Sequence, residues 1–170
     1  LNSGDSTAAR SAIGIKADGT VLLQNGDDRT YTEDVLLRSS IMHLLGDRYG
    51  YVYAPALKPY TDELVGFSLV NGMYAVDNDA GSARLTVSAS VQKAAQEALA
   101  GRKGTIGVYN YQTGEILCAV TSPTYDPDNM PDVEADTTGR YDGVFLNRFF
   151  QTTCVPGSIF KVITAAAAAT

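Results

Sequence analysis

The sequence predicts an α+β protein. A segment with helical periodicity is followed directly by two strand-like runs joined by a turn, which indicates a helix packed on an antiparallel hairpin. Short strands and turns precede this pair. The chain of 170 residues is 45% hydrophobic, enough for the core of one domain or one and a half. A change of pattern near residue 80 predicts two parts, residues 1–81 and residues 82–170.

Residues 1–81 are predicted to form an irregular module of short strands and turns. Strand-like runs at residues 13–15 and 21–23 flank the turn Ala17-Asp18-Gly19, and residues 25–28 form another turn. The composition of residues 77–82, Asp-Asn-Asp-Ala-Gly-Ser, is typical of a linker. The boundary is therefore placed after residue 81.

From residue 86 the spacing changes to that of a helix with one buried face. The apolar positions follow the i, i+3, i+4, i+7, i+8 pattern, and Gly101 ends it: Val91, Ala94, Ala95, Ala98 and Leu99. Residues 105–109 and 115–121 are predicted strands. Gly114, in the turn between them, can adopt the positive φ of a bulged hairpin.

The net charge of −6 argues against a nucleic-acid-binding protein, because phosphates require a basic face. Residues 122–143 carry six acidic residues and one arginine, which accounts for five of the six negative charges. This segment is predicted to be a solvated loop. An EF-hand calcium loop beginning at Asp126 is rejected, because Met130 occupies its fifth position.

The two cysteines, Cys118 and Cys154, form no Cys-x-x-Cys pair, and the chain has a single histidine. The sequence therefore predicts neither a zinc site nor a disulfide scaffold, and no cofactor is expected. No apolar run approaches the ~20 residues of a membrane span, and the N-terminus is no signal peptide. Any anchor is expected to lie outside this chain.

Two Ser-x-x-Lys patterns occur, Ser90 to Lys93 and Ser158 to Lys161, so this spacing alone is not specific. At about 100° per residue Lys93 falls opposite the apolar face of its helix, which predicts a solvated surface for the first pattern. In the second, Pro156-Gly157 fixes a turn immediately before Ser158. Ser158 then lies near a helix N-terminus, where free N–H groups favour developing negative charge.

Lys161 is the only charged residue after Arg148, in a helix that is apolar on every side. Such a helix is predicted to be buried, and since it needs partners on every face, an incomplete domain is expected. Desolvation would lower the pKa of Lys161. A neutral Lys161, one turn from Ser158, would act as general base and make Ser158 the nucleophile of an acyl transfer. The alternative is a helix-starting serine and a lysine that extends to solvent.

Other candidate nucleophiles and bases are weaker. Ser6, in Gly4-Asp5-Ser6, lies in a polar N-terminus, and no Gly-x-Ser-x-Gly elbow occurs. His43 is expected to be a packed side chain, because no triad context accompanies it.

Four segments occur in order over residues 85–170: LTVSASVQKAAQEAL, the hairpin GTIGVYNYQTGEILCAVTSPTYDPDN, Asn147-Arg148 and PGSIFK. Together they resemble the transpeptidase domain of penicillin-binding proteins, the serine D,D-transpeptidases of bacterial cell-wall synthesis. Residues 1–81 resemble, more loosely, the non-catalytic pedestal or dimerisation module of class B enzymes. Ser88 and Cys118 depart from the pattern, since an aspartate and a small or apolar residue are usual there.

The resemblance implies the fold of penicillin-binding proteins and β-lactamases, an antiparallel sheet with helices, of which residues 82–170 would be the first part. Ser158 would attack the D-Ala-D-Ala bond of a peptidoglycan stem peptide, and Lys161 would accept its proton. The backbone N–H of Ser158 would form half of the oxyanion hole. The family's Ser-x-Asn and Lys-Thr-Gly motifs would belong to the remainder of the domain, so this chain alone is expected to be inactive.

The resemblance also implies partners and a location. These are stem peptides, β-lactam antibiotics and the cell-wall synthesis machinery, at the extracytoplasmic face of a bacterial membrane, with an N-terminal anchor outside this chain. The alternatives are a D,D-carboxypeptidase, a β-lactamase or a β-lactam sensor of the same fold, and a non-enzymatic cell-wall assembly module.

Overall fold

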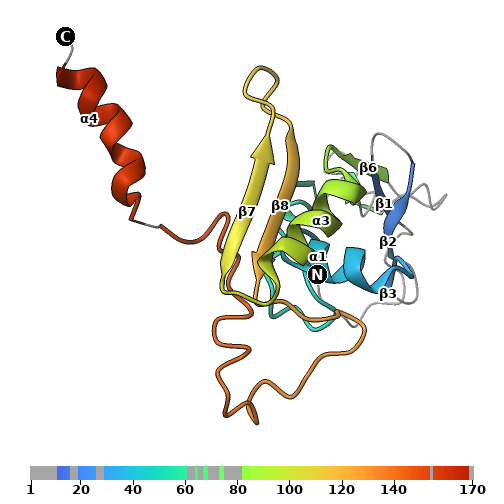
Figure 1. Ribbon diagram of the computed structural model, residues 1–170. Coiled ribbons are helices and arrows are strands. Elements are labelled where there is room, and N and C mark those ends of the chain that lie inside the picture. The colour runs from blue at the N-terminus through green and yellow to red at the C-terminus, as the bar shows by residue number, and fades with distance from the viewer. Residues whose placement is uncertain are drawn as a thin grey trace.

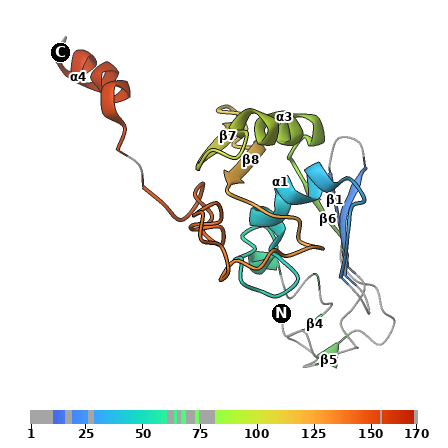
Figure 2. The same ribbon diagram turned by 60° about the horizontal axis from the view of Figure 1, so that its bottom comes forward.

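In the computed structural model the chain is an α+β protein, as predicted, with two helices between a four-stranded sheet and a hairpin (Figures 1 and 2). The structure describes residues 11–15, 19–25, 29–60, 64, 67–68, 73–74, 82–153 and 155–168. Several sequence predictions lie outside these residues: Ser6, Cys154, Ala17 and Asp18 of the first N-terminal turn, residues 26–28 of the second, and the linker up to Gly81.

The first sheet joins strands from both predicted parts of the chain. Its order is β3-β2-β1-β6, with antiparallel pairing except between β1 and β6, which run parallel. The strands predicted at residues 13–15 and 21–23 are confirmed within β1 and β2. A separate pair is formed by β4 and β5. The bounds are Ser11–Ile15 (β1), Val21–Asn25 (β2), Arg29–Tyr31 (β3), Phe67–Ser68 (β4), Met73–Tyr74 (β5) and Ser82–Leu85 (β6).

Helix α1 (Val35–Leu45) was not predicted, so the expectation of strands and turns alone in residues 1–81 was wrong. Asp34 is its N-cap, and the Asp34 carboxylate accepts a hydrogen bond from the Leu37 N–H at 3.0 Å. The buried apolar residues have helical spacing, a signal that the sequence contained: Leu37, Ile41, Leu44 and Leu45. The short 3₁₀ helix η1 (Lys58–Tyr60) follows.

Helix α3 (Ala89–Leu99) is confirmed, but the predicted buried face is only partly correct. Ala95 is buried, whereas Val91 is 38% exposed and Ala94 and Ala98 are also exposed. The helix instead buries Gln92, whose amide nitrogen and oxygen each make a hydrogen bond. Gln92 accepts from the Ala119 N–H at 2.8 Å and donates to the Ser40 carbonyl at 3.3 Å.

The predicted hairpin is confirmed as β7 (Gly104–Tyr109) and β8 (Ile116–Ser122). Gly114 has a φ of 76° in the turn, as predicted, and the register shifts between Val108 and Tyr109. Strand β8 is buried from Cys118 to its end, because α3 and α1 both pack against it.

One hydrophobic core is shared by the two predicted parts. It contains Leu22 and Leu23 of β2, the buried face of α1, and Val87 and Ala119 from the second part. Helices α1 and α3 therefore pack as a layer between the sheet and the hairpin (Figure 2). Among the described residues, no helix has both the length and the apolar composition that a membrane crossing requires.

Replacement of Gly107 tests the contact between β7 and the segment after residue 143. A Cβ on Gly107 would lie 2.0 Å from the Phe149 ring, so Gly107→Ala should displace that ring and destabilise the protein by about 1–3 kcal/mol in chemical denaturation. Gly104→Ala on the same strand is the control, because its Cβ would meet Leu99 at an ordinary 3.7 Å. Equal losses in both variants would contradict the contact.

Candidate functional site

The second Ser-x-x-Lys pattern lies where a 3₁₀ turn becomes an α-helix. Ser158 is in η2 (Gly157–Phe160), and Lys161 is the first residue of α4 (Lys161–Ala168). The Lys161 N–H donates to the carbonyls of Ser158 and Ile159, and Gly157 has a φ of +56°. The predicted turn followed by a helix is confirmed, with Ser158 one turn before Lys161.

Helix α4 was predicted to be buried, but among the described residues nothing covers it, so this prediction was wrong for this chain. Val162 is 73% exposed and Ile159 is 79% exposed, and α4 lies apart from the other elements in both ribbon views (Figures 1 and 2). The side chain of Lys161 is exposed as well. The proposed role of Lys161 as a base was inferred from desolvation of its side chain. The described residues do not provide this desolvation.

The first Ser-x-x-Lys pattern forms a helix surface, as predicted, but its lysine is engaged. Ser90 is exposed in the first turn of α3, and Lys93 Nζ lies 3.0 Å from Asp34 Oδ2. Asp34 thus caps α1 and binds α3 at the same time. Its pKa is lowered by the Leu37 N–H and by Lys93. Both serines are exposed, so the two patterns differ in their lysines. Lys93 forms this ion pair, whereas the side chain of Lys161 is exposed.

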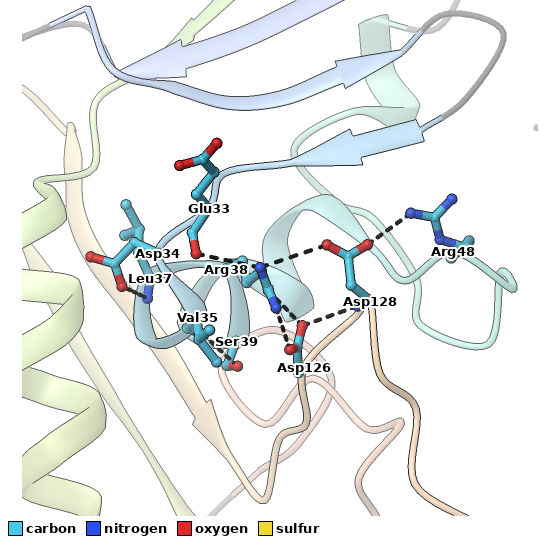
Figure 3. Close-up of polar contacts among 9 residues, drawn as sticks. All are labelled: Glu33, Asp34, Val35, Leu37, Arg38, Ser39, Arg48, Asp126 and Asp128. Atoms are coloured by element: carbon cyan, nitrogen blue, oxygen red, sulfur yellow. Dashed lines mark hydrogen bonds and ion pairs between the residues drawn. The ribbon is translucent and has the colours of Figure 1, made fainter.

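Two carboxylates of the acidic loop bind arginines of the N-terminal half (Figure 3). Arg38 of α1 binds both carboxylate oxygens of Asp126 along one side of its guanidinium, through Nε at 2.6 Å and Nη2 at 2.5 Å. Arg48 binds Asp128 at 2.7 Å. The Asp126 side chain is only 18% exposed, and Arg38 lowers its pKa. The prediction of a solvated loop was therefore wrong for this part of it.

Residues of β3 and Tyr125, which follows β8, also bind the C-terminal end of α1 and the residues just after it. The Tyr125 hydroxyl donates to the buried Asp47 carboxylate at 3.2 Å, and Asp47 also accepts from the Val52 N–H at 2.8 Å. Tyr31 donates to the Gly46 carbonyl at 2.8 Å, and burial raises the pKa of Tyr31 to about 12. Arg29 donates to the carbonyls of Leu45 and Asp47. The bonds to Leu45 and Gly46 satisfy carbonyls that the end of a helix leaves unpaired.

His43 is packed, as predicted, and is 1% exposed. Its Nε2 lies 2.8 Å from the Val144 carbonyl, and its own carbonyl accepts from Asn147 Nδ2 at 2.6 Å. Burial lowers the pKa of His43 to about 4, so the ring is neutral at physiological pH. Sequence reasoning placed His43 correctly but missed both partners, because they lie about 100 residues away.

Cys118 is buried in β8, and burial raises its pKa. Among the described residues, no group of three His, Cys, Asp or Glu side chains is placed to hold a metal ion.

Residues 104–170 match the family described as the penicillin binding protein transpeptidase domain. The chain is 32% identical over 127 residues to the peptidoglycan D,D-transpeptidase PbpA of Mycobacterium tuberculosis, covering 67% of this chain and 26% of the relative. It is 32% identical over 120 residues to PbpA of Mycolicibacterium smegmatis, covering 63% of this chain and 24% of that protein. The chain thus spans about a quarter of the length of these curated relatives.

Removing the charge of Asp126 should destabilise the attachment of the loop to α1. Asp126→Asn loses a two-point charged contact and should lower the free energy of unfolding by about 1–3 kcal/mol. Asp128→Asn breaks a more exposed pair and should cost less than about 1 kcal/mol. Chemical denaturation measures both, and an equal or reversed order would contradict the partial burial of the Arg38–Asp126 pair.

His43 should make stability depend on pH below neutrality. Between the unfolded pKa of 6.5 and the folded pKa of about 4, the unfolded chain binds one proton more, so stability falls as pH falls. The expected slope is about 1.4 kcal/mol per pH unit. Denaturation curves from pH 7 to pH 4 measure it, and His43→Gln should flatten this part of the profile. An unchanged slope in that variant would assign the effect to other groups.

Proposed function

Because the chain belongs to the penicillin-binding protein family and carries part of its transpeptidase domain, we propose that it acts in a peptidoglycan D,D-transpeptidase with Ser158 as nucleophile and Lys161 as general base. The observation that supports this most is the placement of Ser158-Ile159-Phe160-Lys161. It lies inside the matched residues 104–170 and at the start of a helix. The relatives named D,D-transpeptidases favour this activity over a carboxypeptidase, a β-lactamase or a sensor.

The proposed reaction is an acyl transfer in two steps. Ser158 Oγ attacks the carbonyl carbon of the D-Ala-D-Ala bond while Lys161 Nζ accepts the hydroxyl proton. The Ser158 backbone N–H stabilises the oxyanion. The terminal D-Ala leaves as an amine with the proton, which yields a serine ester. An amine of a neighbouring stem peptide then attacks the ester carbonyl, which forms the cross-linking amide and breaks the bond to Ser158 Oγ. The proton lost by the amine returns to Ser158 Oγ through Lys161. A β-lactam acylates Ser158 in the same way, through its strained amide.

Lys161 can accept a proton only as a neutral amine, which requires burial beyond that found in this chain. The exposed apolar side chains around it would supply a packing surface for the remainder of the domain: Val155, Ile159, Phe160, Val162 and Ile163. Packing there would desolvate Lys161 and bring the Ser-x-Asn and Lys-Thr-Gly motifs to Ser158. We therefore propose that catalysis needs that remainder.

The proposed setting is the extracytoplasmic face of a bacterial membrane, with an anchor N-terminal to this chain. There the protein would contact peptidoglycan stem peptides and the cell-wall synthesis machinery. Residues 1–81 would form a non-catalytic module and residues 82–170 the first part of the catalytic domain. The shared core and the β1–β6 pairing support a close attachment of the two.

Labelling with a fluorescent penicillin tests the nucleophile. The full-length protein should form a stable adduct at Ser158, and Ser158→Ala should abolish the adduct, because no other side chain would accept the acyl group of the penicillin. Ser90→Ala is the matched control from the other Ser-x-x-Lys pattern and should label normally. Label that survives Ser158→Ala, or a wild-type protein without label, would refute the proposal. Rapid hydrolysis of the adduct would instead favour a β-lactamase.

A further inference from the structure

A short segment before the nucleophile motif is bonded to α1 by a buried pair of contacts. The Nε2 of His43 lies 2.8 Å from the Val144 carbonyl, so Nε2 carries the proton and donates. The amide Nδ2 of Asn147 donates back to the His43 carbonyl at 2.6 Å. Each of the three residues is about 1% exposed, so water does not compete for these bonds. One residue of α1 thus bonds this segment at two points.

Asn147 also organises the turn on its other side. Its Oδ1 accepts from the Phe149 N–H at 3.1 Å and the Phe150 N–H at 3.3 Å. The Asn147 backbone N–H donates to Gln151 Oε1 at 2.8 Å, and the Gln151 N–H donates to the Asn147 carbonyl at 2.8 Å. Asn147 therefore connects α1 to the turn at three residues, through its side chain to Phe149 and Phe150 and through its backbone to Gln151.

The opposite side of this turn is fixed against the hairpin. The Phe149 ring occupies the space where a side chain at Gly107 of β7 would lie. Ser158 follows Gln151 by seven residues, so at most about 25 Å of extended chain separates them. The position of this turn therefore limits where Ser158 can lie relative to the hairpin.

We propose that His43 and Asn147 are positioning residues for the nucleophile, and that α1 sets through them the start of the segment that delivers Ser158. The inference rests on the proposed function, and it assigns the N-terminal half a part in acylation. Neither side chain is proposed to touch the substrate. Loss of the contact would let the turn shift, and displacements of about 1 Å at a reacting atom are enough to slow a reaction up to ~100-fold.

The experiment measures acylation of the full-length protein by a fluorescent penicillin, with the maximal rate constant separated from the half-saturating concentration. His43→Leu keeps the apolar bulk and removes the donor to Val144. His43→Gln restores a donor at the distance of Nε2. Asn147→Ser keeps an acceptor for the Phe149 N–H but cannot reach the His43 carbonyl. If His43→Leu does not fold, Asn147→Ser still tests the contact between α1 and the turn, because it removes the hydrogen bond from Asn147 to the His43 carbonyl.

Gln92→Leu is the matched control, because Gln92 is equally buried and also hydrogen-bonds a carbonyl of α1, that of Ser40. Neither of its two described hydrogen bonds reaches the turn at residues 144–151, since the other one joins it to Ala119 of β8. Thermal unfolding of each variant reports the loss of stability, and rates are compared per folded molecule.

We expect His43→Leu and Asn147→Ser to lower the maximal acylation rate about tenfold or more, with His43→Gln within about threefold of wild type. Gln92→Leu should lose similar stability and keep its rate within about twofold. Rates that fall equally in His43→Leu and Gln92→Leu, or in neither, would overturn the inference and leave His43 a purely structural role. A wild-type protein without label would overturn the proposed function itself, so the two failures are distinguishable.

Discussion

The burial of α1 is the constraint on which the other described segments depend. Burial removes water from polar groups along the helix, and each must find a partner within the protein. Four of its carbonyls accept a hydrogen bond from a side chain outside the helix: Ser39 from Thr124, Ser40 from Gln92, His43 from Asn147, and Leu45 from Arg29. On its outer side Arg38 binds Asp126. The segment after β8, α3 and the turn before Ser158 are thereby placed relative to a single helix.

The two sides of the candidate site differ in how firmly they are held. The turn that ends at Gln151 is anchored by buried hydrogen bonds to α1 and by the Phe149 contact with β7. The motif that begins at Ser158 is exposed, and its apolar neighbours have no cover among the described residues. The chain therefore fixes the turn that precedes Ser158, the proposed nucleophile. The chemical environment of Lys161 would have to come from additional packing, as an exposed amine remains in contact with water.

The sequence allowed the hairpin, α3 and the turn before α4 to be predicted, because their signals are local. Helical spacing, Gly114 and Pro156-Gly157 act over a few residues. The buried face of α3 was predicted less well. Hydrophobicity favoured Val91, whereas the structure buries Gln92, whose amide hydrogen-bonds a backbone group of α1 and one of β8. A polar residue at an interface of this kind cannot be recognised without its partners.

The sequence by itself determined the α+β class, the two Ser-x-x-Lys patterns and the resemblance that the family match supports. Only the tertiary structure decided that Asp126 is held by Arg38 and that His43 meets Asn147. The physical reason is distance along the chain. Periodicity and turn chemistry are fixed by neighbouring residues, whereas the partner of a buried charge or carbonyl, some 100 positions away, is chosen by packing.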